Sequence, residues 1–360
     1  MIDDKLHIPK YIQLKEDIKQ IIESGKLQPD ERMFSRNELI RDYSVSDITV
    51  RKAIDELTAE GYVYSIQGKG TFVARRKTKH LTIGLVISHL HELGDSNNGY
   101  LDQSYIAPLV HIIEHEVRKI GGRVLLCLDN DSVKEERKNL QDLMDREVDG
   151  IVTIYIGGEE NQDCLIRIKE AGIPLVLMDR YARNIETSYV VTDSFIGAYN
   201  ATKYLIQKNV ASIHHLTCAD EATTTSERLK GFAKALKDFE LKGSIKRLTA
   251  VSSNIDMSEQ SYTAAFDLLK LKHPIGVFAA NSTLASSVWR CFRESGLEYD
   301  DFAISCFDKP PFAIPPDANI AWVQQPLEEM GKKCIQMLHS QMNGDLKSRK
   351  IILEPKIYMH

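Results

Sequence analysis

The 360-residue sequence predicts an α+β winged helix-turn-helix domain followed by an α/β domain built from two doubly wound parallel sheets. Two observations lead to this fold class. Residues 34–73 combine two short helical patterns with a hairpin pattern that has a Gly-Lys-Gly tip. From residue 81 onward, short apolar strands alternate with helices, which is typical of parallel sheets covered on both faces. The chain is long enough for one small and one larger domain.

Residues 1–75 are expected to form the small domain. Its first helix should span Lys10 to Ser24 and end at a glycine. Ser35 and Glu38 have the spacing of a capping box, so a second helix should begin there. Ser46 is placed to cap a third helix. The apolar face of that third helix would consist of Val50, Ala53, Ile54 and Leu57.

The other face of the third helix points to DNA as the partner. Its polar residues are Ser46, Asp47, Thr49, Arg51 and Lys52. A helix fits the major groove, where a long side chain such as Arg51 reaches a guanine edge or a phosphate. The tip residues Gly68, Lys69 and Gly70 let the hairpin backbone approach the duplex, with Lys69 in the minor groove or on a phosphate. The alternative is a small protein-binding module with a solvated charged face.

Residues 9–74 resemble the DNA-binding domain of GntR-type bacterial regulators. The matching motifs are Pro9-Lys10-Tyr11, Asn37-Glu38-Leu39, Val45-Ser46, Thr49-Val50-Arg51-Lys52-Ala53 and Gln67-Gly68-Lys69-Gly70-Thr71-Phe72-Val73. The resemblance implies binding to double-stranded operator DNA, and it adds further expected contacts at Lys10, Tyr11, Ser35, Arg36 and Asn37. Phe34 replaces the usual proline, and Asp47 replaces a frequent arginine, so the operator sequence does not carry over from the family.

Charge and cysteine usage fit a cytoplasmic DNA-binding protein. Residues 1–79 hold 15 basic and 13 acidic side chains, whereas the remainder holds 31 basic and 38 acidic ones. No stretch approaches the roughly 20 apolar residues of a membrane span. The six cysteines are scattered as in reduced cytoplasmic proteins, and His89-x-His91 lacks partners at ligand spacing. We therefore expect no metal, no cofactor and no membrane contact.

A basic connector precedes the larger domain. Residues 76–80 are expected to be the linker, and they follow Arg75 with further basic side chains. The connector is either a plain solvated linker or an additional source of nonspecific phosphate contacts.

Residues 81–360 are expected to contain the two α/β lobes. Strands are predicted at 81–88, 123–128, 150–154, 174–178, 212–216, 276–279 and 302–306. Helices are predicted at 104–120, 133–146, 165–171, 194–207, 226–239, 258–270 and 282–295. In such sheets ligands bind at the carboxyl ends of the strands. Asp179, Arg180 and Asp308 lie at predicted strand ends and are therefore candidate ligand residues.

Residues 81–358 resemble the effector domain of LacI-type regulators and periplasmic sugar-binding proteins. The motifs are Val148-Asp149-Gly150-Ile151, Gly172-Ile173-Pro174-Leu175-Val176, Met178-Asp179-Arg180, Glu227-Arg228, Ala279-Ala280-Asn281, Cys306-Phe307-Asp308 and Val323-Gln324-Gln325-Pro326. Together with the N-terminal domain, the chain resembles the arabinose-repressor branch of GntR-type regulators. The resemblance implies a periplasmic-binding-protein-like fold whose cleft is lined by Asp179, Arg180, Arg228, Asp308 and Gln325.

Three further residues each have two possible roles. Asn281 either contacts the effector or caps the next helix, because serine replaces the aspartate usual after it. Tyr105 and Tyr155 either form an aromatic platform for a sugar or pack in the core. Planar multivalent side chains suit a polyol, whose hydroxyls both donate and accept hydrogen bonds.

The function predicted is a ligand-responsive transcriptional regulator, as a rule a repressor released from its operator by a monosaccharide such as arabinose, another pentose or a deoxyhexose. A sugar phosphate or a non-sugar metabolite is the alternative effector. An enzyme fused to a DNA-binding domain is the weaker alternative, because we find no nucleophile elbow, P-loop, G-x-G-x-x-G or metal motif. A homodimer is expected, since readers of this type bind half-sites related by a two-fold axis.

Overall fold

The computed structural model describes residues 8–74, 81–87, 105–130, 132–156, 158–220, 222–249, 257–345 and 347–360. The chain divides into two compact units, Met1–His80 and Leu81–His360. The expected linker 76–80 and the His89-x-His91 pair lie outside the described residues.

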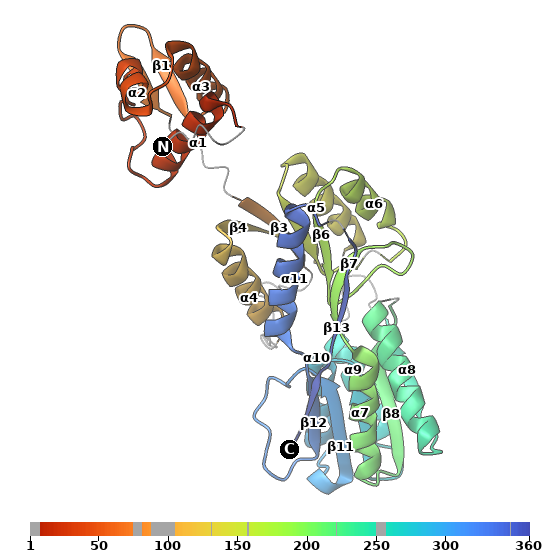
Figure 1. Cartoon of the computed structure of the whole chain (residues 1–360). Coiled ribbons are helices and arrows are strands. Elements are labelled where there is room, and N and C mark those ends of the chain that lie inside the picture. Colours follow the sequence, from red (N-terminus) through yellow and green to blue (C-terminus); the bar gives the residue numbers. More distant parts are fainter. Residues whose placement is uncertain are drawn as a thin grey trace. The chain divides into compact units, whose positions relative to one another are not determined.

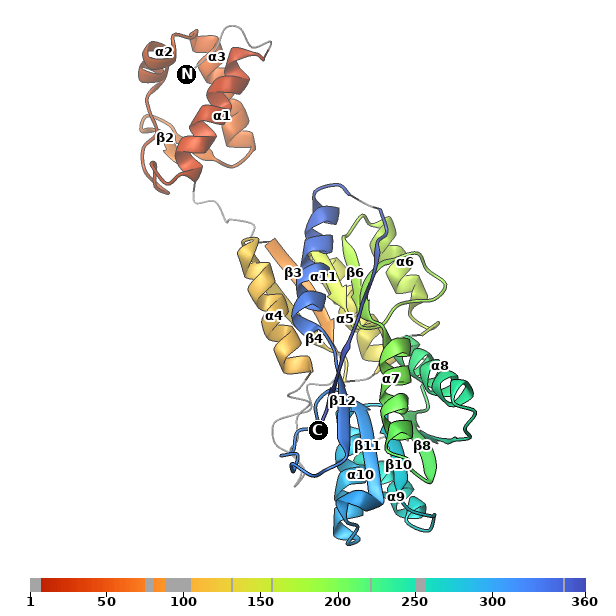
Figure 2. The same cartoon turned by 60° about the horizontal axis from the view of Figure 1, so that its bottom comes forward.

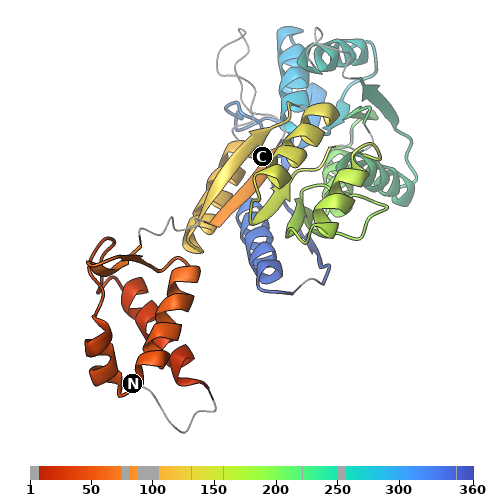
Figure 3. The same cartoon turned by 90° about the horizontal axis from the view of Figure 1, so that it is seen from above.

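The N-terminal unit contains three helices and a hairpin (Figure 3). Its elements are α1 (Lys10–Glu23), α2 (Arg36–Tyr43), α3 (Asp47–Ala59), β1 (Val63–Ile66) and β2 (Gly70–Val73). The Ser35 capping box and the Ser46 cap both form as predicted, with each hydroxyl accepting a backbone N–H three residues on. The helices enclose one apolar core of Leu14, Ile18, Leu39, Val50, Ala53, Leu57 and their neighbours.

An ion-pair group joins α1 to the end of α3. The Lys15 ammonium lies 2.9 Å from the Glu56 carboxylate and 3.0 Å from that of Glu60. Lys19 contacts Glu60 as well. The lysine side chains are 13% and 16% exposed and the glutamates 34% and 37%, so water screens these pairs only in part.

The first lobe of the larger unit is a parallel six-stranded sheet with helices on both faces (Figure 1). Its strand order is β13-β7-β6-β5-β3-β4. The strands are β3 (Leu81–Ile87), β4 (Gly122–Leu128), β5 (Gly150–Thr153), β6 (Leu175–Met178), β7 (Ser188–Thr192) and β13 (Lys350–Leu353). One face packs on α4 (Ile106–Lys119) and α11 (Leu327–Met342), and the other on α5 (Val133–Asp145) and α6 (Gln162–Glu170).

The second lobe repeats this arrangement, with an antiparallel strand at one edge. Its strand order is β14-β12-β11-β10-β8-β9, and β14 is the antiparallel strand. The strands are β8 (Ser212–Cys218), β9 (Ser244–Leu248), β10 (Ile275–Ala279), β11 (Phe302–Phe307), β12 (Ile320–Gln324) and β14 (Lys356–Met359). One face packs on α7 (Ser194–Gln207) and α8 (Thr223–Asp238), and the other on α9 (Met257–Leu268) and α10 (Ser282–Glu294).

The chain passes between the lobes after β7, after β12 and after β13 (Figure 2). As a result α11 follows a strand of the second lobe but packs on the first. Sequence patterns did not predict β7, β9, β12, β13, β14 or α11. The start expected for α8 at residue 226 was also wrong, because the helix begins one turn earlier at Thr223.

No helix within the described ranges is long and apolar enough to cross a membrane. Among the same residues, no cluster of three or more His, Cys, Asp and Glu side chains is arranged to hold a metal ion. All six cysteines are free thiols.

Candidate effector site and DNA-reading surface

Two carboxylates mark the ends of central strands in the two lobes. Asp179 directly follows β6 and Asp308 directly follows β11. Both residues adopt the left-handed conformation, with φ of 65° and 62°, which aspartate tolerates better than most residues. They are only 7% and 5% exposed. The charges of both carboxylates influence Tyr105 and Arg228. The two lobes therefore bring these strand ends close together.

Gln325 completes the strand-end set in the second lobe. It follows β12, which pairs in parallel with β11, so its side chain lies next to the end of β11. The Gln325 amide Nε2 donates a hydrogen bond of 3.0 Å to Asp308 Oδ2. This contact fixes the amide orientation, because nitrogen must face the carboxylate.

Arg228 projects from α8 toward the same carboxylates. Its Nη1 donates to the Ala280 carbonyl oxygen at 2.8 Å, and its guanidinium carbon lies 3.8 Å from the ring centroid of Phe307. Burial lowers the pKa of Arg228, and the charges of Asp179 and Asp308 oppose that effect. The guanidinium remains charged because the ordinary arginine pKa is so high. The ring and the carbonyl together hold it in one orientation.

Two first-lobe side chains join this group. Arg180 Nε lies 3.7 Å from Asp179 Oδ2. Tyr105 stands just before α4, and burial, followed by the charges of Asp179 and Asp308, raises its pKa well above the ordinary tyrosine range. Tyr105 is therefore a neutral phenol, which both donates and accepts hydrogen bonds.

Several polar atoms of this cluster are buried without a partner. Asp179 Oδ1, Gln325 Oε1 and Arg228 Nε have no hydrogen-bond partner among the described residues. The first two are acceptors and the third is a donor. Buried polar groups are nearly always paired, so such a group of orphans indicates a place for a hydroxyl-bearing ligand or water.

The structure thus brings together six of the eight predicted effector residues, namely Tyr105, Asp179, Arg180, Arg228, Asp308 and Gln325. Tyr155 has other surroundings, since its hydroxyl donates to the Gly158 carbonyl at 2.6 Å and its ring packs between α5 and α6. Asn281 caps α10, its side-chain oxygen accepting the Leu284 N–H at 2.9 Å. The contacts of Tyr155 are those of a core residue, and the contact of Asn281 is that of a helix cap.

Sequence reasoning missed the beginning of α8. Thr223, Thr224 and Thr225 are buried there, and the backbone N–H of Tyr181 in the first lobe donates to the Thr223 hydroxyl at 3.3 Å. That contact joins the two lobes beside Arg180. The run of hydroxyl residues ahead of Arg228 could have indicated this earlier helix start, because such residues are typical of helix N-termini.

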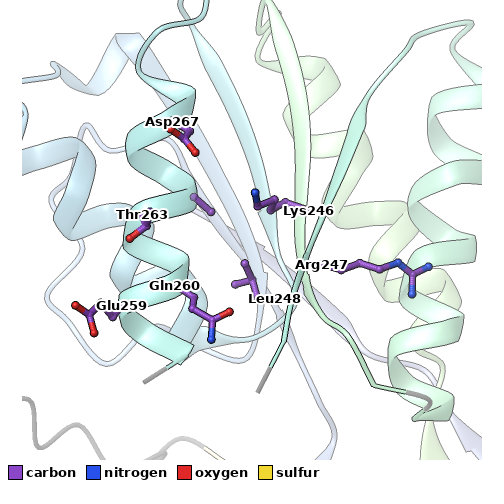
Figure 4. Close-up of a pocket in the computed structure, with 8 residues that line it drawn as sticks. Lys246, Arg247, Leu248, Glu259, Gln260, Thr263 and Asp267 are labelled. Atoms are coloured by element: carbon purple, nitrogen blue, oxygen red, sulfur yellow. The ribbon is translucent and has the colours of Figure 1, made fainter. Parts of the chain in front are cut away.

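A separate open hollow of about 440 Å³ lies between β9 and α9 (Figure 4). It is lined by Lys246, Arg247, Leu248, Glu259, Gln260, Thr263, Ala264 and Asp267, none of which belongs to the cluster above. Residues 250–256, which connect β9 to α9, lie outside the described residues. We take the buried cluster at the strand ends, and not this hollow, as the candidate ligand site.

The predicted DNA-contacting residues lie on one small domain and are mostly exposed. Exposed side chains are Lys10, Ser35, Arg36, Asn37, Ser46, Asp47, Arg51, Lys52 and Lys69, together with Gly68. Tyr11, Thr49 and Gly70 are half-buried. The Lys52 ammonium lies 3.8 Å from the ring centroid of Tyr11, so α1 and α3 present these two residues as a unit.

The hairpin tip requires glycine. Gly68 and Gly70 have φ of 76° and 115°, which L side chains rarely adopt. A Cβ on Gly70 would lie 3.1 Å from Arg32 Nε. The tip therefore presents Lys69 on a short exposed turn with little side-chain bulk around it.

Comparison with known proteins gives the family. Residues 96–346 match the model of the periplasmic binding protein domain. The chain belongs to this family. Residues 10–73 match the model of bacterial regulatory proteins of the gntR family, so a GntR-type helix-turn-helix precedes the periplasmic-binding-protein domain. This combination is that of a transcriptional regulator that binds DNA.

Relatives that match most of the chain are named as repressors, not enzymes. The chain is 28% identical to an "Arabinose metabolism transcriptional repressor" of Geobacillus stearothermophilus, over 92% of this chain and 90% of that protein. It is 27% identical to a protein of the same name from Halalkalibacterium halodurans, over 97% and 95%. A LacI family regulator from Enterococcus faecium solved with bound ribose shares the fold, with a TM-score of 0.64, 21% identity and coverage of 77% of this chain and 96% of that one.

Proposed function

We propose that this regulator represses carbohydrate-utilisation genes and is controlled by a monosaccharide held between its two lobes. Arabinose, another pentose and a deoxyhexose are the leading candidates. The observation that carries the proposal is the set of buried, unpartnered atoms on the strand-end residues Asp179 and Gln325 and on Arg228 of α8. The names of the two arabinose-metabolism repressors and the ribose complex of a protein with the same fold support it.

The charges of the cluster favour a neutral ligand. Asp179 and Asp308 supply two negative charges, and Arg180 and Arg228 supply two positive ones. A balanced set leaves no surplus positive charge for an anion, whereas its donors and acceptors match sugar hydroxyls. Phe307 is held under the Arg228 guanidinium and is therefore not free to stack on a sugar.

A sugar phosphate is the second candidate, and the start of α8 favours it. The N-cap residue Ala222 provides no side-chain hydrogen bond, and the first turn contains no acidic residue. Three buried threonine hydroxyls lie in that turn. A helix N-terminus with free backbone N–H groups attracts phosphate. Titration with a free pentose and with its phosphate ester distinguishes the two candidates.

In the proposed mechanism, ligand binding draws the lobes together and changes the spacing between the two DNA-binding domains of a homodimer. The ligand shifts this equilibrium only by its different affinity for the open and closed states. The Tyr181–Thr223 hydrogen bond already joins the lobes in this structure, and we expect the ligand to strengthen contacts of this kind. Analytical ultracentrifugation of the full chain should show a dimer at micromolar concentration, and a monomer would contradict this part of the proposal.

The function is tested by fluorescence-anisotropy titration of the full chain on a duplex obtained by selection from a random library. We expect tight binding that one monosaccharide of a panel weakens at least tenfold. Gln325→Leu should bind the duplex normally but lose the response, because the Asp308 carboxylate loses its fixed partner and a ligand acceptor disappears. Gln336→Leu, at an exposed position of α11, is the matched control. Absence of any response across pentoses, hexoses and their phosphates would contradict the proposal.

A further inference from the structure

Ile48 is an exposed isoleucine in the first turn of α3. It is 79% exposed, more than any other large hydrophobic side chain in the described residues. The other large apolar residues of α3, Val50, Ile54 and Leu57, are buried in the domain core, which does not include Ile48. Ile48 therefore contributes nothing to core packing, and a β-branched residue does not favour helix formation either.

The surroundings of Ile48 are polar and fixed. The Ser46 hydroxyl accepts the Thr49 N–H at 3.3 Å and lies 2.8 Å from the Thr49 hydroxyl, which holds the first turn in place. Asp47 and Arg51 are exposed beside it. An apolar surface for a protein partner would need a larger contiguous patch than one side chain. Ile48 is a single apolar group within a polar face.

The position of Ile48 suggests a role in DNA recognition. Single exposed apolar residues are common on protein surfaces, but this one lies where a reading helix contacts base edges. Asp47, next to it, disfavours close approach to phosphates and so favours presentation of this turn to the bases rather than to the backbone. In the major groove the thymine 5-methyl is the apolar feature that distinguishes a base pair.

We propose that Ile48 reads the 5-methyl group of a thymine in each operator half-site. The inference rests on the proposed DNA-binding function and adds a specificity-determining residue to it. The contact buries one methyl group against the isoleucine side chain, and its loss should weaken binding about fourfold per half-site, the ratio that corresponds to about 0.8 kcal/mol.

The test uses the full chain and the selected operator duplex, in which each thymine is replaced in turn by uracil. Uracil keeps every hydrogen-bonding group of thymine and lacks only the methyl. For the natural chain, one symmetric pair of replacements should weaken binding about sixteenfold in total. Ile48→Ala should bind the thymine duplex more weakly and bind thymine and uracil duplexes equally at that position. Ile48→Val, which keeps a branched apolar side chain, should retain the preference.

Ile166→Ala is the matched control, because Ile166 is an isoleucine 43% exposed on α6 of the effector domain. It should leave the thymine preference unchanged. If Ile48→Ala discriminates thymine from uracil as well as the natural chain at every position, the Ile48 contact is refuted while DNA binding stands. If selection yields no specific duplex at all, the proposed function fails and the inference fails with it.

Discussion

Asp308→Asn isolates the charge of one strand-end carboxylate. Asparagine has the same shape and also tolerates the left-handed backbone found there, with φ of 62°. A hydrogen bond to a charged group contributes about 1.5–3 kcal/mol and one between neutral groups about 0.5–1.5 kcal/mol. Loss of the charge should therefore weaken effector binding by about 1–1.5 kcal/mol, or about five- to twelvefold.

Asp308→Ala should behave differently. Alanine in the left-handed conformation costs about 1–2 kcal/mol, and the Gln325 amide loses its acceptor at a further cost of about 1–3 kcal/mol. The alanine variant should therefore lose stability as well as affinity, and the asparagine variant affinity alone. Isothermal titration calorimetry and urea unfolding separate the two effects. Asp317→Asn, on the exposed loop that follows, is the matched control. Unchanged effector affinity in Asp308→Asn would refute the placement of Asp308 in the site.

Three further predictions concern stability and DNA binding. Burial lowers the pKa of His215 from 6.5 to about 4, so the folded protein holds this side chain neutral. Because the unfolded chain takes up a proton there first, the protein's free energy of unfolding should fall by about 3 kcal/mol as the pH drops from 6.5 to 4. His215→Phe should remove most of that fall, and the exposed His339→Phe should not, in urea titrations at several pH values. Gly231→Ala should lower the melting temperature, because a Cβ there would lie 2.2 Å from the Phe195 carbonyl oxygen. Lys69→Ala should weaken binding to all duplexes alike. The slope of log affinity against log salt concentration should become smaller by about one for each hairpin that contacts DNA.

Local sequence signals predicted the N-terminal domain well. The Ser35 capping box and the Ser46 cap act within one helical turn, so the sequence contains everything needed to recognise them. The strand-end aspartates could be found for a similar reason. Asp179 and Asp308 each follow an apolar run, and the rule that ligands bind at the carboxyl ends of parallel strands then makes both of them candidates for the ligand site.

The missed elements depend on distant partners. Strand β13 has only one buried residue in four and forms by pairing with β7, more than 150 residues earlier in the chain. Helix α11 follows a second-lobe strand and yet packs on the first lobe, which no local pattern indicates. The sequence likewise could not distinguish a core position from a ligand position for Tyr155, because an aromatic ring suits both.

The central claim, that a sugar in the effector domain controls DNA binding, is tested most directly by measuring the coupling in both directions on the full chain. Thermodynamic linkage requires that the sugar weakens operator binding by the same factor by which the operator weakens sugar binding. We predict equal factors of at least ten, obtained by anisotropy for the duplex and by calorimetry for the sugar. A monosaccharide that binds with the same affinity whether or not the operator is present would contradict the account.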